Sequence, residues 1–132
     1  DHKPDIAGWM LAPDGDVRSA NMLETVQNQY QVQGLELDYT IVCWDGDLRR
    51  AESGWQAWKM SGSSWQRDKE LEIATNGHRV LLTRARKGMI IFVPRGDLTG
   101  EDETRPKAMY DEIAEYLMKC GACEIQPSLN FT

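Results

Sequence analysis

Two stretches of the chain are nearly continuous in apolar residues, and each has the length of a single strand. Asp38–Trp44 reads DYTIVCW and Met89–Val93 reads MIIFV. Runs of this length, rich in β-branched and aromatic residues, are typical of strands that are buried on both faces of a parallel sheet. The pattern therefore predicts two core strands, with helices covering both faces of their sheet.

Helical periodicity lies on either side of the second predicted strand. Apolar positions recur at intervals of three and four over residues 69–86, although Gly77 costs about 1 kcal/mol relative to alanine in a helix. A last helix is predicted over residues 106–119, because proline is favourable as a first helical residue. Strands that alternate with helices predict an α/β domain with a mainly parallel sheet.

The remaining segments carry weaker patterns. We expect Ile6–Leu11 to be a strand or a docked arm and Met22–Val26 to be a strand, and the letters CEIQ, residues 123–126, predict a closing strand. Residues 45–67 are rich in Gly and Ser and contain three tryptophans. This Trp-rich insertion is predicted to be ordered, with its indoles folded back onto the core.

Length and charge narrow the class of protein. A chain of 132 residues has the length of one domain, so we expect residues 1–132 to form a single unit. The net charge of −6 disfavours wrapping of nucleic acid around the whole surface, because non-specific affinity comes mainly from Lys and Arg. A local basic patch is compatible with this charge, and Arg79, Arg84, Arg86 and Lys87 cluster in the sequence.

Targeting signals and cysteines indicate a compartment. No apolar run approaches the roughly 20 residues of a membrane span, and no signal peptide is recognisable, so we expect a cytoplasmic protein without membrane contact. Three cysteines, an odd number, argue against a disulfide framework and fit a reducing compartment. Cys120 and Cys123 are expected to be two small buried residues.

A first candidate motif, VQGLELD, lies directly before the first predicted strand. Gly34 would permit close approach of a phosphate or ribose at the edge of the sheet, and Gln33 and Glu36 would supply hydrogen bonds there. The alternative is a turn that only leads into the strand, with Gln33 and Glu36 solvated.

A second candidate motif, LLTRARKG, joins the predicted helix to the second strand. Arginine presents a planar fork that matches phosphate oxygens, and Arg84 lies where it could stabilise charge on a transferred phosphoryl group. The alternative is that Arg84 and Arg86 are cations at a helix C-terminus, where they gain roughly 0.3–1 kcal/mol.

Together these motifs resemble the last motifs of superfamily 1 DNA/RNA helicases, in which a Q-G-L-E loop precedes one core strand and a T-R-A helix end precedes another. QVQGLELDYTIVCWDGDL, HRVLLTRARKGMIIFVP and RGDLTGEDETRPKAMYDEIAEYLMKCG are most similar to the bacterial Schlafen-group-3-like DNA/RNA helicase domain family. The resemblance implies the second RecA-like domain of a two-domain motor, a three-layer sandwich with a mainly parallel sheet and helices on both faces.

The resemblance also implies roles for individual residues. Arg84 falls on the arginine that reaches the γ-phosphate of ATP from across a cleft, and Arg86 is expected to face the same nucleotide. Gln33, Gly34 and Glu36 fall on the loop at the nucleotide. Asn28 and Tyr30 stand where a nucleic-acid-binding threonine and a histidine are common, and the resemblance implies that they lie at the nucleic acid.

The helicases that the sequence resembles also need a phosphate-binding loop, and this sequence lacks one. No G-x-x-x-x-G-K-[ST] phosphate-binding loop occurs in the chain. ATP with Mg²⁺ is therefore expected only together with an N-terminal P-loop domain of the same parent protein, and the chain alone is not expected to be active. The expected track is DNA or RNA in single-stranded form.

Two other classes of function compete with the motor interpretation. One is a non-catalytic RecA-like docking module that uses Trp55, Trp58 and Trp65 as protein anchors or base-stacking platforms.

The other competing class is a metal-dependent nuclease or hydrolase, which would use carboxylates near the first strand, namely Glu36, Asp38, Asp45 and Asp47. Asp38 and Asp45 lie at opposite ends of that strand, about 20 Å apart at ~3.3 Å per residue, which argues against one shared ion.

Overall fold

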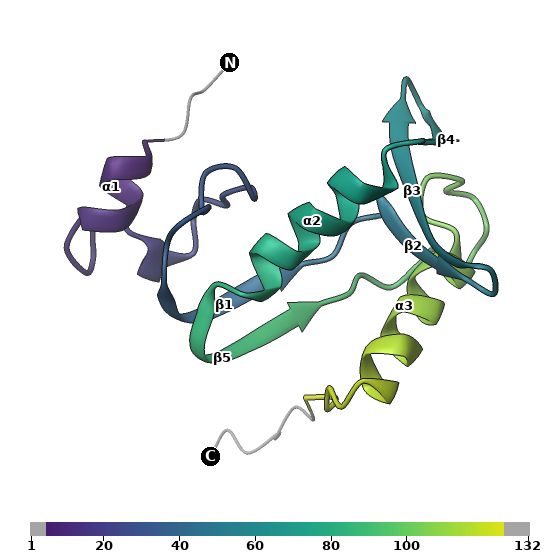
Figure 1. Ribbon diagram of the computed structural model, residues 1–132. Helices are drawn as coiled ribbons and strands as arrows, with labels where there is room; N and C mark the ends of the chain where they lie inside the picture. The colour runs from purple at the N-terminus through teal and green to yellow at the C-terminus, as the bar shows by residue number, and fades with distance from the viewer. Residues whose placement is uncertain (1–4, 126–132) are drawn as a thin grey trace, which may run out of the picture. The chain divides into compact units, whose positions relative to one another are not determined.

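The computed structural model describes residues 5–125 (Figure 1). Two compact units are present: the residues up to Thr40 together with Asn76–Met89, and Ile41–Thr75 together with the residues from Ile90 onward. Helices and strands occur in both units, with a small parallel sheet and a separate antiparallel sheet. The predicted mixed α/β class is confirmed, whereas a RecA-like three-layer sandwich stays a prediction.

The parallel sheet consists of β1 (Leu37–Cys43) and β5 (Ala85–Phe92). Leu37 N donates to Arg84 O at 3.0 Å at one end, and Trp44 N donates to Phe92 O at 2.9 Å at the other. The arrows of the two strands point the same way in Figure 1. Both strands predicted from the apolar runs are confirmed, and β5 begins four residues earlier than the run suggested.

Burial on both faces of these strands, by contrast, is not observed. Side chains alternate along a strand, so Val42 lies on one face of β1, with Trp44 directly after the strand, and Tyr39 and Ile41 share the other face. Val42 and Trp44 are buried, whereas Tyr39 is 71% and Ile41 50% exposed. The side chains of Tyr39 and Ile41 on this face of β1 are therefore largely open to solvent.

The first unit begins with a helix where the sequence predicted a strand or docked arm. Helix α1 (Ile6–Leu11) forms because the Asp5 side chain caps it, accepting a hydrogen bond from Gly8 N at 2.9 Å. The strand predicted over Met22–Val26 is also wrong. A 3₁₀ turn (Ala20–Met22) ends there at Leu23, whose φ of 59° is left-handed and incompatible with a strand.

Helix α2 (Leu71–Leu82) confirms the predicted helix but is shorter at both ends. Its last turn tightens, since Thr83 N and Arg84 N donate to the carbonyls of Val80 and Leu81, three residues back. The Arg84 carbonyl then accepts from Leu37 N and begins the pairing with β1. Sheet formation therefore ends the helix before Ala85.

The second unit contains an antiparallel sheet built from the Trp-rich insertion, β2 (Leu48–Ala51), β3 (Gly54–Ser61) and β4 (Ser64–Arg67). Ala51 pairs with Gly54 and Ser61 with Ser64, so each loop has two residues. Gly62, with a φ of 62°, supplies the left-handed backbone that such tight hairpins need. The letters SGSS carried this hairpin signal, but these three strands were not predicted.

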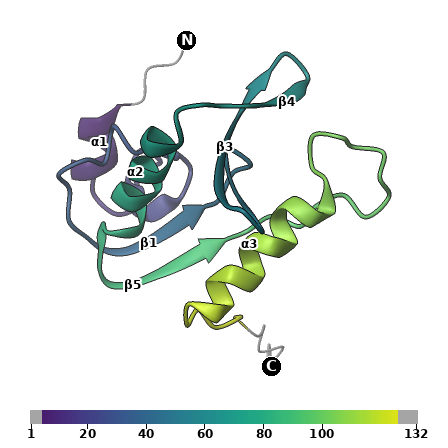
Figure 2. The ribbon, with the colours of Figure 1, turned by 45° about the vertical axis from the view of Figure 1, so that its right-hand side comes forward.

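Helix α3 (Lys107–Lys119) covers one face of β2 and matches the helix predicted over residues 106–119 (Figure 2). Leu48 and Ala57 pair across β2 and β3, so their side chains share a face, and both are buried. Ile113 of α3 is fully buried, and Met109 and Tyr110 are buried beside it in sequence. These apolar side chains are the core of the second unit.

Two of the three insertion indoles have partners in this unit that lie outside the antiparallel sheet. The Trp55 ring lies 6.0 Å from that of Trp44 and meets the Tyr116 ring edge-on at 5.0 Å. Trp65 Nε1 donates to Thr104 O at 2.7 Å, a bond across 39 residues. Both indoles therefore connect the antiparallel sheet to neighbouring segments.

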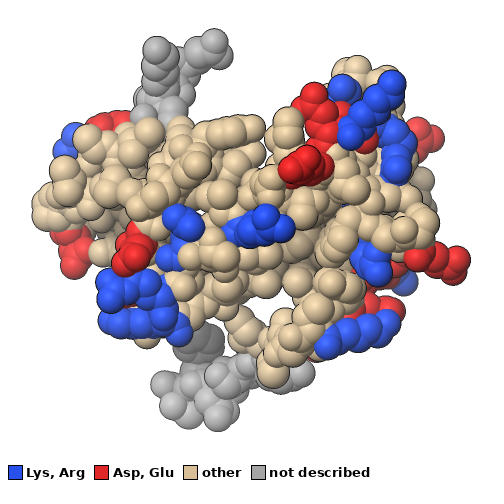
Figure 3. Space-filling view, viewed as in Figure 1, with Lys and Arg blue, Asp and Glu red and all other residues tan. Residues whose placement is uncertain are grey.

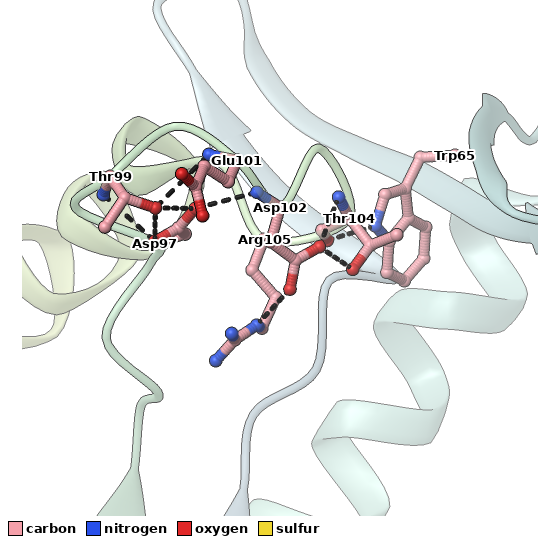
Figure 4. Close-up of polar contacts among 7 residues, drawn as sticks. All are labelled: Trp65, Asp97, Thr99, Glu101, Asp102, Thr104 and Arg105. Atoms are coloured by element: carbon pink, nitrogen blue, oxygen red, sulfur yellow. Dashed lines mark hydrogen bonds and ion pairs between the residues drawn. The ribbon is translucent and has the colours of Figure 1, made fainter.

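The loop between β5 and α3 is organised by the Asp97 carboxylate (Figure 4). It accepts hydrogen bonds from Thr99 N at 3.0 Å, Thr99 Oγ1 at 2.8 Å and Asp102 N at 2.7 Å. Donation from the Asp102 and Thr99 amides lowers the pKa of Asp97 to about 2. The Asp102 carboxylate continues the network to Thr104 and Arg105.

The cysteines are exposed, which corrects the expectation that Cys120 and Cys123 are buried. They follow the end of α3, where Gly121 has a φ of 103° and turns the chain outward. Residues 123–125 form no strand, and Gln126, the last residue of the predicted closing strand, lies outside the described residues. Over residues 5–125, no helix has the length and apolar character to cross a membrane.

Two glycine substitutions should change stability in opposite directions. At buried Gly96 an added Cβ overlaps backbone atoms of Lys107, so Gly96→Ala should lower the free energy of unfolding by about 1–3 kcal/mol. At Gly77, in α2, the Cβ makes ordinary contact at 3.4 Å with the flexible Gln29 side chain, and Gly77→Ala should gain up to ~1 kcal/mol. Urea unfolding followed by circular dichroism measures both, and equal effects would contradict the packing.

The Asp97 network should make stability depend on pH. Because its folded pKa is depressed, Asp97 contributes stability above its ordinary value of 3.8, and this contribution is lost as the pH falls to about 2. Asp97→Asn should therefore be less stable than wild type near neutral pH, with the difference vanishing in acid. Urea midpoints across pH test this, with Glu103→Gln, an exposed acid of the same loop, as control. A difference that is independent of pH would be inconsistent with the network.

Candidate functional site

The two candidate motifs meet in the first unit. The Q-G-L-E loop, residues 33–36, leads directly into β1, and the T-R-A segment, residues 83–85, links α2 to β5. The backbone bond from Leu37 N to Arg84 O joins the end of one motif to the other. Segments that are nearly 50 residues apart in the sequence are therefore neighbours, as adjacent parallel strands require.

Arg84 is the residue that connects them through its side chain. Its Nη1 donates to Leu35 O at 3.1 Å, its Nε to Val80 O at 2.9 Å, and its Nη2 to Thr83 Oγ1 at 3.1 Å. The guanidinium is thus held at the C-terminal end of α2, where the helix dipole favours a cation. A position at the end of this helix was predicted for Arg84 by both interpretations of the sequence, so it does not decide between them.

All three acceptors of Arg84 are neutral oxygens. Among the described residues, no carboxylate lies within salt-bridge distance of its guanidinium, in contrast to the bases that follow it in the chain. An arginine keeps its charge at any relevant pH. The half-buried Arg84 is therefore oriented by hydrogen bonds while its positive charge is not neutralised by an anion.

The bases that follow Arg84 are paired with the acids of the first motif. Arg86 Nη1 lies 3.8 Å from Glu36 Oε2, and Lys87 Nζ lies 2.8 Å from Asp38 Oδ2. The hydrogen bond from Lys87, and then the charges of Lys87 and Arg86, lower the pKa of Asp38. Both pairs are solvent-exposed, so their charges cancel locally with little gain in stability.

Gly34 is required by the turn. Its φ is 86°, and Leu35 N donates to Val32 O at 3.1 Å across it. A Cβ at Gly34 would meet nothing within 4 Å, so the space beside this backbone is open. Val32 is buried and anchors the loop, whereas Gln33 is exposed.

The two expected nucleic-acid residues lie in the preceding turn. Asn28 Oδ1 accepts from Tyr30 N at 3.0 Å and from Gln31 N at 3.2 Å, which is a common local use of an Asn side chain. The Tyr30 ring is 69% exposed. Asn28 therefore shapes the turn, and Tyr30 presents an aromatic ring to solvent.

The described residues bring no metal cluster together: no group of three or more His, Cys, Asp or Glu side chains could hold an ion. Of the carboxylates proposed for a nuclease, Glu36 and Asp38 are ion-paired to arginine and lysine. Asp45 accepts from its neighbour Gly46 N at 2.6 Å. The nuclease interpretation thus finds no support in the structure.

Sequence reasoning missed all three partners of Arg84, which are Val80 O, Leu35 O and Thr83 Oγ1. Thr83 Oγ1 donates to Arg79 O at 2.8 Å and accepts from Arg84, so it fixes the orientation of the guanidinium. A threonine directly before an arginine at a helix end is a signal that could have been used. The Leu35 carbonyl gave no such signal, because every residue has one.

Comparison with known proteins identifies a family. A family model described as Schlafen group 3, DNA/RNA helicase domain, matches residues 4–95, which include both motifs and end within the loop between β5 and α3. The similarity seen in the sequence from Gly96 onward lies outside this match. No curated protein and no solved structure matches the chain.

The tether from Arg84 to the loop can be tested with two equivalent substitutions. Arg84→Gln removes the bond to Leu35 O and should lower the free energy of unfolding by about 1–3 kcal/mol. It should also speed amide hydrogen exchange in residues 31–37, measured by mass spectrometry. Arg86→Gln breaks only an exposed ion pair and should cost ~0.5 kcal/mol or less. Equal exchange in both variants would contradict a tether.

Proposed function

The chain belongs to the Schlafen group 3, DNA/RNA helicase domain family, and from that premise we propose that it is the C-terminal motor part of a nucleic-acid-dependent ATPase or helicase. It would act with an N-terminal P-loop domain of the same parent protein. Its contribution is an arginine finger, Arg84, and the Q-G-L-E loop, both presented to a nucleotide bound by the other domain.

One observation carries the proposal: Arg84 is held by neutral acceptors and has no anionic partner among the described residues, although the two basic residues nearby are neutralised. A guanidinium that is oriented but not neutralised suits a site where negative charge arrives with a ligand. The γ-phosphate of ATP is such a ligand. Arginine fingers act on it by stabilising charge that develops during transfer.

The loop residues fit a supporting role. The space beside Gly34 is open, and Gln33 and Glu36 are exposed next to it. These side chains can hydrogen-bond a ribose or link the nucleotide to the track. Arg86, held near Glu36, can exchange that carboxylate for a phosphate oxygen, because both partners are exposed and their separation is 3.8 Å.

Magnesium would have to be held elsewhere. The described residues offer no cluster of oxygen ligands, and the sequence has no phosphate-binding loop. The residues present therefore fit the phosphate of a nucleotide and do not fit its metal ion. This division supports a site shared between two domains, in which the P-loop domain supplies Mg²⁺ coordination.

The uncovered face of β1 supports placement in a larger domain. Parallel sheets are normally covered on both faces, whereas Tyr39 and Ile41 are largely exposed here. Further strands and helices of a RecA-like sandwich would cover them.

Single-stranded DNA or RNA would run past the Asn28 turn, where the exposed Tyr30 ring can stack on a base.

ATP hydrolysis by the parent protein tests the proposal. With single-stranded nucleic acid present, Arg84→Ala should lower kcat by ~10³–10⁵-fold, the range expected for loss of an arginine finger. Lys87→Met is the control, because Lys87 is an exposed base three residues away that is paired with Asp38. Equal rates in wild type and Arg84→Ala would exclude the finger.

A further inference from the structure

One face of the antiparallel sheet in the second unit combines indoles with arginines. Arg49 pairs with Gln56, Trp58 with Arg67, and Met60 with Trp65, so these side chains project from one face of β2, β3 and β4. Leu48 and Ala57, which are buried, project from the opposite face. We call the residues Arg49, Trp58, Met60 and Arg67 the arginine–indole face.

Cations and rings alternate on this face. The Arg49 guanidinium lies 4.3 Å from the Trp58 ring centre and 4.7 Å from that of Trp65, and Arg67 lies 5.4 Å from the Trp58 ring. Arg49 is also fixed by its Nε, which donates to Gly46 O at 2.8 Å. The Trp58 ring therefore has two guanidinium groups over it, of which that of Arg49 is fixed by a hydrogen bond.

Neither arginine of this face is neutralised. Over residues 5–125, no carboxylate lies within salt-bridge distance of Arg49 or Arg67, whereas the adjacent Lys59 is paired with Asp68 at 3.6 Å. Burial lowers the pKa of Arg49, yet an arginine stays charged at neutral pH. Arg49 Nη2 is buried without an acceptor. This face thus keeps positive charge in a protein of net charge −6.

Arg67 is the accessible cation of the pair. It is exposed, and its guanidinium makes no hydrogen bond to any described residue, so its five N–H donors are available. Blue side chains are visible over the β3–β4 hairpin in Figure 3. A guanidinium plane restrained on an indole loses less freedom on binding a phosphate than a free one does.

Trp58 is also the tryptophan of the insertion best placed to meet a ligand. Trp55 is packed against Trp44 and Tyr116, and Trp65 donates to Thr104 O with its ring against Gly46. All three indoles are half-buried, and Trp58 differs in having the cations of Arg49 and Arg67 over its ring and the 44% exposed Met60 on the same face.

We propose that the arginine–indole face binds single-stranded nucleic acid, with Arg67 on a backbone phosphate and an unstacked base against Trp58 and Met60. Unneutralised arginines call for an anion, and flat rings beside them favour one that carries planar aromatic groups. The inference rests on the proposed function for its choice of nucleic acid over another polyanion. It adds a contact in the second unit, distinct from the turn at Asn28 and Tyr30.

Fluorescence anisotropy with labelled oligo(dT) and oligo(rU) of about 20 nucleotides, longer than the ~4–16 that one such module covers, tests the proposal on this chain without ATP. Arg67→Ala should weaken binding by ~10-fold and reduce the slope of log K against log salt by ~1. Lys59→Ala removes the same charge from the other face of β3 and should change affinity less than ~2-fold. Trp58→Phe should abolish most of the tryptophan quenching caused by the oligonucleotide.

Three outcomes would overturn the proposal. These are no binding by wild type, equal losses for Arg67→Ala and Lys59→Ala, and equally tight Arg67-dependent binding of poly-glutamate, which would identify an acidic protein partner. Because the measurement needs no nucleotide, a negative result leaves the ATPase proposal standing. Conversely, an inert Arg84→Ala in the ATPase assay leaves this result interpretable.

Discussion

A guanidinium that cannot lose its charge determines how the first unit is assembled. Arg84 is half-buried at the end of α2, and its Nη1 satisfies the Leu35 carbonyl 49 residues away in sequence. The same residue's carbonyl accepts from Leu37 N and starts the pairing of β1 with β5. Loop conformation, helix end and strand register therefore depend on one residue, and removing its side chain would break the bond that joins the loop to the helix end.

The second unit also contains a half-buried arginine, Arg49, but its guanidinium is held by different contacts. Arg49 bonds to one carbonyl, that of Gly46, and its guanidinium lies near the rings of Trp58 and Trp65, where each contact is worth roughly 0.5–2 kcal/mol. Neither solution neutralises the charge. Ion pairs such as Lys87 with Asp38 do neutralise it, and they cluster beside Arg84. Some basic side chains are thus neutralised by a carboxylate, whereas Arg84 and Arg49 keep a positive charge that no nearby carboxylate neutralises.

The sequence predicted what depends on long periodic or apolar runs. β1, β5, α2 and α3 were all found this way, with errors of a few residues at their ends. The strands of the antiparallel sheet were not predicted, because β2 and β4 have four residues each and lack a clear alternation of apolar and polar positions. α1 was misread because six apolar or small residues suit a strand as well as a helix, and the Asp5 cap decided the outcome.

The sequence was sufficient to predict that the two motifs of the candidate site lie side by side. It was not sufficient to predict the hydrogen bonds between them. Parallel strands preceded by two motifs imply that the motifs are neighbours, and the Leu37 to Arg84 bond bears this out. Arg84 bonds to the backbone carbonyls of Leu35 and Val80 and not to a carboxylate. The sequence could not predict this, because every residue type has the same backbone carbonyl. Glu36 and Asp38 were equally near in sequence, yet they pair with Arg86 and Lys87 instead.

Local and overall charge act over different ranges in this protein. At a distance, a polyanion meets a chain of net charge −6 and is repelled, but this field decays over a Debye length of about 10 Å at 0.1 M salt. At contact, Arg67 and Arg84 are oriented cations that no carboxylate of the described residues cancels. Attraction is therefore confined to positions where the ligand touches these side chains. Such an arrangement favours attraction of anionic groups at fixed points over general adhesion of a polyanion to the whole surface.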